Sequence, residues 1–119
     1  MNYWQKRRRA FACAFKGIYS MFATEAHPKI HLLAMVCVIL FGFLFHIEPW
    51  EWCAVSICIG GVFMAEAFNT AIERLADKVT RERDPLIGAA KDIAAGAVLL
   101  FVFASVAVGL IIFIPKFIA

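Results

Sequence analysis

Charge is scarce in this 119-residue chain, and that scarcity excludes several classes of protein. Charged residues make up only 18% and hydrophobic residues 63%, against roughly 25% and 45–50% in soluble globular domains. Disorder, a coiled coil and a large soluble enzyme are therefore excluded. The net charge of +3 is too small to suggest a nucleic-acid partner. We predict a small integral membrane protein.

The chain also lacks the common patterns for metal, disulfide and nucleotide sites. Its four cysteines form no CxxC pair and all lie in apolar stretches, which argues against a zinc site or a disulfide framework. They are Cys13, Cys37, Cys53 and Cys58. There is no GxxxxGK[ST] motif, so a P-loop is excluded, and a protein-kinase fold is excluded as well. Any nucleotide chemistry must use other residues.

Three long apolar runs are present, and each approaches the ~20 residues that a membrane-spanning helix requires. The predicted spans are residues 30–47, 50–68 and 93–114. Before them, residues 3–25 carry aromatic and aliphatic side chains at helical spacing behind a basic start, which is typical of an amphipathic helix in the membrane interface. We therefore predict an all-α membrane protein over residues 1–119, a single domain with one interfacial helix and three transmembrane helices.

The basic residues predict the orientation of the spans. Eleven of the twelve Lys and Arg residues lie before the first span or between the second and third, and only Lys116 lies in the C-terminal tail. By the positive-inside rule, the side of the membrane that carries these eleven basic residues is cytoplasmic. The N-terminus is then inside and the C-terminus outside, with Trp50 and Trp52 in an outer aromatic belt.

Four polar residues on one helix face need an explanation. Glu66, Asn69, Glu73 and Asp77 fall within an arc of roughly 80° at about 100° per residue. At 1.5 Å per residue, Glu66 lies about 21 Å from Trp52 along the helix, which is still inside the inner leaflet. A carboxylate inside a membrane is costly and is functional by default. The alternative is a helix that has left the membrane with a solvated acidic face, and for Asp77 the two interpretations are equally good.

Two further features complete a candidate site. Glu25 ends the predicted interfacial helix at the depth of Glu73, and two carboxylates at one level can hold Mg²⁺ beside substrate phosphates. Asp84 and Pro85 are typical of a helix start. A helix that begins there places Lys91 near the cytoplasmic boundary. Its charge could meet a phosphate at that depth, and the alternative is that the side chain extends to the lipid headgroups. These residues together suit phosphoryl transfer from a nucleotide to an alcohol embedded in lipid.

Two longer motifs resemble those of a known family. The run from Glu66 to Asp77, EAFNTAIERLAD, and the later run AKDIAAGAVL from Ala90 resemble the signatures of the bacterial diacylglycerol kinase and undecaprenol kinase family. Lys16-Gly17 and Glu25 extend the likeness over nearly the whole chain. The resemblance implies a homotrimer in the bacterial inner membrane that phosphorylates a lipid alcohol with ATP and Mg²⁺, with active sites between subunits.

The resemblance also assigns roles to individual residues. Glu66 matches the catalytic base, and Glu25 and Glu73 match metal-binding carboxylates that also contact the nucleotide. Asn69 and Asp77 match supporting polar residues. The remaining nucleotide-binding positions are Lys6, Glu82, Arg83, Asp84, Lys91 and Asp92.

The acceptor and one other class of function stay open. The stretch KIHL at residues 29–32 resembles the Gram-positive branch, whose usual acceptor is undecaprenol, whereas His27 and Pro28 depart from that branch. Diacylglycerol is therefore the second acceptor. A small proton-linked transporter or a membrane adaptor is the alternative from another class; it explains Glu66 but gives no role to Glu25, Glu73 and Lys91.

Overall fold

The computed structural model describes all 119 residues as four helices with no strand. They are α1 (Tyr3–Thr24), α2 (His27–Leu44), α3 (Pro49–Val79) and α4 (Pro85–Ile118). Helices α2, α3 and α4 are long and apolar enough to cross a membrane, and α1 is not. The predicted all-α membrane fold is confirmed.

The helix boundaries follow from local residue chemistry. Asn2 and Gln5 form a reciprocal capping box at the start of α1. The Asp84 side chain accepts hydrogen bonds from the backbone N–H groups of Leu86 and Ile87, and Pro85 occupies the first turn of α4, as the sequence predicts. The first membrane helix runs over 27–44 rather than 30–47. The helix can begin before residue 30 because proline is accepted in a first helical turn. It ends before residue 47 because His46 adopts a left-handed φ of 53°, which a continuing α-helix excludes.

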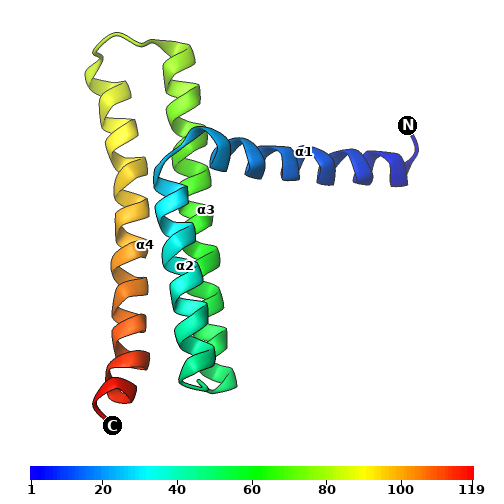
Figure 1. The fold of residues 1–119 in the computed structure, drawn as a ribbon. Coiled ribbons are helices and arrows are strands. Elements are labelled where there is room, and N and C mark those ends of the chain that lie inside the picture. Colours follow the sequence, from blue (N-terminus) through cyan, green and yellow to red (C-terminus); the bar gives the residue numbers. More distant parts are fainter.

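Three of the helices run side by side, and the first leaves them (Figure 1). Helices α2, α3 and α4 lie side by side, while α1 extends away from them to one side, with the N-terminus far from the bundle. The arrangement suits α1 to a membrane surface and the other three to its interior.

The single chain buries little of itself. Only 14 of its 119 residues are buried, and the largest apolar cluster lies at the end opposite the α3–α4 loop, around Ile47, Val55 and Ile112. At the same end the buried Glu51 carboxylate lies 2.8 Å from Lys116 Nζ, which joins the start of α3 to the end of α4. Most of the apolar surface of the spans is left for lipid or for other subunits.

Helices α3 and α4 come close at one glycine. Gly61 faces the ring of Phe101, and a Cβ atom at residue 61 would overlap that ring. A glycine is required there because only hydrogen leaves room for the aromatic side chain. The contact holds the two longest helices together half-way along their length.

Candidate functional site

Glu66 lies in the middle of α3 and is almost fully enclosed, with 2% of its surface exposed. It lies on α3 between Phe63, whose ring packs against Phe22 of α1 with 5.4 Å between the ring centroids, and Arg74, which hydrogen-bonds to α1. Its Oε1 atom is buried without a hydrogen-bond partner, as is Oδ1 of Asn69. Buried polar atoms without partners are rare in proteins and call for an explanation.

The closest ionisable neighbour of Glu66 comes from another helix. His31, in the second turn of α2, places its Nε2 atom 3.0 Å from Glu66 Oε1. Oε1 forms no hydrogen bond in this arrangement, so it keeps lone pairs that can accept one. The histidine side chain is 22% exposed and the glutamate 2%, so His31 lies on the more accessible side of the pair.

Further along α3, two of the acidic side chains meet Lys91. The Nζ atom of Lys91 lies 2.7 Å from Asp77 Oδ1 and 3.6 Å from Glu73 Oε2. The sequence places all three residues at one membrane boundary, and the structure brings them together across α3 and α4. Glu73 and Asp77 remain partly exposed, so this group lies where a soluble nucleotide can reach it.

Arg74 joins α3 to the last turn of α1. Its guanidinium donates hydrogen bonds to Ser20 Oγ at 2.9 Å, to the Ser20 carbonyl at 3.3 Å and to Thr24 Oγ1. Thr24 precedes Glu25, and Arg74 follows Glu73. These contacts therefore bring together the two segments that carry the predicted metal-binding carboxylates.

The other predicted nucleotide-binding residues are more scattered. Asp84 uses Oδ1 to cap α4, and the Glu82 backbone N–H donates to Thr80 Oγ1 in the α3–α4 loop. Arg83 and Asp92 are exposed at the same end. Lys6 lies in the first turn of α1, at the end that points away from the bundle, and one chain does not bring it to the others (Figure 1).

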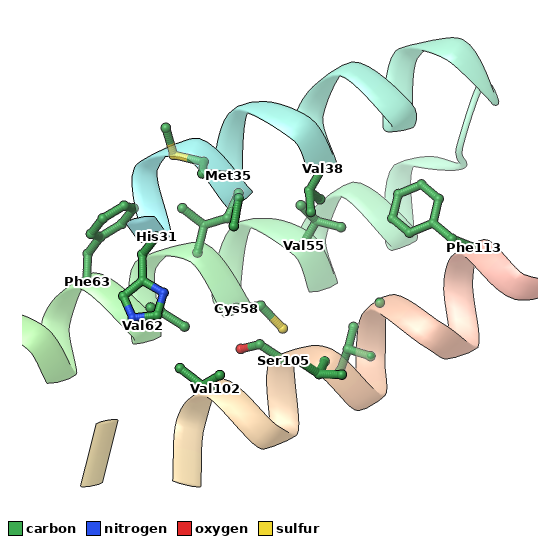
Figure 2. A pocket seen from close by; sticks show the side chains of 15 residues that line it. His31, Met35, Val38, Val55, Cys58, Val62, Phe63, Val102, Ser105 and Phe113 are labelled. Carbon is green, nitrogen blue, oxygen red and sulfur yellow. The ribbon is translucent and has the colours of Figure 1, made fainter. Parts of the chain in front are cut away.

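An apolar cavity of about 230 Å³ lies between α2, α3 and α4. Fifteen residues line it, twelve of them hydrophobic, and His31 stands at one end with Phe113 at the other (Figure 2). Ser105 and Cys58 lie near its middle, and the Ser105 hydroxyl is buried without a hydrogen-bond partner. His31 therefore borders both the cavity and the Glu66 carboxylate.

A comparison with known proteins identifies the family to which this chain belongs. Residues 12–113 match the family model of prokaryotic diacylglycerol kinase. The chain belongs to the prokaryotic diacylglycerol kinase family. It is therefore a membrane lipid kinase, and the transporter and adaptor alternatives fall away.

Two curated members of this lipid kinase family show how far the similarity extends. The chain is 42% identical over 108 residues to the undecaprenol kinase of Bacillus subtilis, a match that covers 91% of this chain and 88% of that protein. It is 36% identical over 107 residues to the diacylglycerol kinase of a Synechocystis species, covering 89% of this chain but only 61% of that longer protein.

Two residues of the lipid kinase site escaped prediction. In the sequence, His31 stands out only as part of the KIHL stretch at residues 29–32, and nothing singles out Arg74. Both make their contacts with a different helix, 35 and at least 50 positions away in the chain. Periodicity within one helix shows which face a residue is on, and it does not show what packs against that face.

Proposed function

We propose that this lipid kinase transfers the γ-phosphoryl group of ATP to the hydroxyl of undecaprenol, with diacylglycerol as the second candidate acceptor. The observation that carries the proposal is Glu66: a buried carboxylate with an unpartnered oxygen, next to the end of an apolar cavity. An alcohol at the end of an apolar chain is the group that such a site would receive, since its hydroxyl can donate to the free oxygen while its chain stays out of water.

Glu66 acts as the general base in this proposal. The alcohol O–H bond breaks as its proton passes to the carboxylate, the alcohol oxygen bonds to the γ-phosphorus, and the bond to the β-phosphate oxygen breaks to release ADP. Enzymes of phosphoryl transfer gain most of their rate from positioning and charge stabilisation, with a carboxylate orienting the attacking hydroxyl. Asn69, one turn from Glu66 on α3, supports the same polar face with its own unpartnered oxygen.

The nucleotide is assigned to the end of the molecule with the α3–α4 loop. Lys91 is the central cation there and would exchange part of its pairing with Asp77 for a phosphate oxygen. The same end carries four more predicted nucleotide-binding residues, Glu82, Arg83, Asp84 and Asp92. Lys6 would be supplied by the α1 helix of a neighbouring subunit.

Mg²⁺ is assigned to Glu25 and Glu73. Both donors are carboxylates, the protein ligands that Mg²⁺ prefers; one chain gathers no group of three His, Cys, Asp or Glu side chains, so the ATP phosphates and water would supply the other ligands. Arg74 and Thr24, the chain neighbours of Glu73 and Glu25, are hydrogen-bonded to each other. When bound, the ion would neutralise charge on the ATP phosphates.

Two further assignments concern the setting of the site. The concentration of Lys and Arg at the α3–α4 loop end favours a cytoplasmic location for that end, with the C-terminus outside a bacterial inner membrane. An oligomer is favoured because Glu73 and Asp77 stay partly exposed in one chain, and the family resemblance makes that oligomer a homotrimer. Small residues on α4 would let subunits approach closely; they are Ala90, Ala94, Ala95, Gly96 and Ala97.

The undecaprenol assignment rests on the Bacillus subtilis relative, which is an undecaprenol kinase. That match covers most of this chain and most of the relative. To test it, purified protein in lipid–detergent micelles would receive ATP labelled at the γ-phosphate, Mg²⁺ and either undecaprenol or diacylglycerol. We expect label in both lipid phosphates, with the larger kcat/KM for undecaprenol. A larger value for diacylglycerol would reverse the assignment, and no labelled lipid from either would refute the proposed acceptors.

A further inference from the structure

The enclosure of Glu66 creates a difficulty for its role as a base. A buried carboxylate oxygen without a hydrogen-bond donor is costly, and a general base must point at the proton that it accepts. Glu66 therefore needs a nearby donor that holds its carboxylate in one direction, and it needs one from a neighbouring helix.

The stronger cations near the site are bonded elsewhere. Lys91 is held by Asp77 and Glu73, and Arg74 is held by Ser20 and Thr24. The ionisable group in contact with Glu66 is His31, with 3.0 Å between Nε2 and Oε1. Two lone pairs would repel at this separation, so a proton between the atoms is the stable arrangement.

We propose that His31 is a positioning residue for the kinase reaction, whose imidazole N–H donates to Glu66 and fixes the direction of its carboxylate. This inference rests on the proposed role of Glu66 as the base. A hydrogen bond to a carboxylate is stronger than one between neutral groups, so it holds the carboxylate firmly. The terminal torsion of histidine is broad, so the ring can turn its N–H toward Oε1.

The place of His31 in the fold suits this role. It borders the apolar cavity on one side and Glu66 on the other (Figure 2). A lipid hydroxyl that arrives from the cavity would therefore meet a carboxylate already oriented by the imidazole. His31 keeps its own protons during the reaction; the proton of the alcohol goes to Glu66.

Two substitutions separate positioning from simple packing. His31→Leu removes the N–H, and His31→Gln retains an N–H donor of similar reach. Loss of one hydrogen bond to a charged group corresponds to about a 10- to 100-fold loss of rate. We expect that loss in kcat for His31→Leu, with the KM for ATP unchanged, and we expect most of the rate to return in His31→Gln. His31→Phe retains an apolar ring if the leucine variant packs poorly. His27→Leu, an exposed histidine one turn earlier on α2, is the matched control.

A double mutant and an infrared spectrum show whether His31 acts through Glu66. In a Glu66→Gln background, His31→Leu should cause no further loss of kcat. The carboxyl band that Glu66→Gln removes should also lie at a different frequency in His31→Leu, because the hydrogen bond to that group is lost. Wild-type turnover in both His31→Leu and His31→Phe, equal loss in His31→Leu and His31→Gln, or an unshifted band would each overturn the proposal. Full activity of Glu66→Gln would instead show that the base itself was wrongly assigned.

Discussion

Replacing Glu66 by glutamine gives the sharpest test of the proposed chemistry, because it changes almost nothing else. The two side chains have the same number of heavy atoms, so no cavity opens at a position with 2% exposure. The amide oxygen can still face His31 Nε2, which lies 3.0 Å from the position it would occupy. We therefore expect the variant to fold, assemble and bind ATP as the wild type does.

The expected loss of turnover is large. An amide cannot accept the proton of the alcohol, and a positioned general base contributes about 10²–10⁴ in rate. At about 1.36 kcal/mol for each factor of ten, the activation barrier should rise by about 2.7 to 5.4 kcal/mol. The turnover of Glu66→Asp should fall between those of the wild type and Glu66→Gln. It keeps the carboxylate but withdraws it by about one C–C bond, 1.5 Å, and a displacement of that size can cost about 10²-fold.

The assay is transfer of labelled phosphate from ATP to the lipid in a single turnover, with saturating ATP and Mg²⁺ and with ATP binding measured separately. Thermal unfolding in detergent serves as the control for folding. Turnover of Glu66→Gln within a few-fold of wild type, or an aspartate variant less active than the glutamine variant, would refute the assignment of the base.

Three further outcomes follow from the contacts at the α3–α4 loop end. Glu25→Gln and Glu73→Gln should each raise the Mg²⁺ concentration needed for half-maximal activity or abolish ATP binding; unchanged Mg²⁺ titrations in both would exclude a shared metal site. Arg74→Met should loosen α1 and raise the Mg²⁺ requirement while Glu25 and Glu73 stay intact, detectable as faster amide exchange near Thr24, and unaltered exchange would show that the three hydrogen bonds do not hold the helix. Glu66→Gln and Asp92→Asn subunits, each inactive alone, should recover partial activity when co-assembled. If mixed oligomers form and no activity returns at any ratio, the site lies within one subunit.

Most of the fold could be predicted from the sequence because membrane helices obey simple rules of length and composition. Asp84 and Pro85 marked the start of α4 correctly, since a capping side chain followed by proline suits only that position. The helix that carries the first predicted span begins three residues before residue 30. That lower limit was drawn from hydropathy, which cannot register that Pro28 is favourable inside a first helical turn.

The site was less predictable because its contacts join different helices. Glu66, Asn69, Glu73 and Asp77 could be placed on one face from their spacing alone. The pairing of Lys91 with Asp77 and the approach of His31 to Glu66 depend on how far α2 and α4 slide and rotate against α3. The sequence of a single chain contains no pattern that specifies those offsets.

The close packing of Gly61 against Phe101 contributes to one of those offsets. A residue larger than glycine at position 61 would have to displace the Phe101 ring. A slip of one helical turn would displace α4 by about 5.4 Å, twice the 2.7 Å that separates Lys91 Nζ from Asp77 Oδ1. The alignment of charged groups at the α3–α4 loop end thus depends in part on two uncharged residues in the middle of the bundle, next to Val62 and Val102 of the cavity lining. A larger residue at position 61 would act on the helix register and on the cavity at once, although it replaces no polar group.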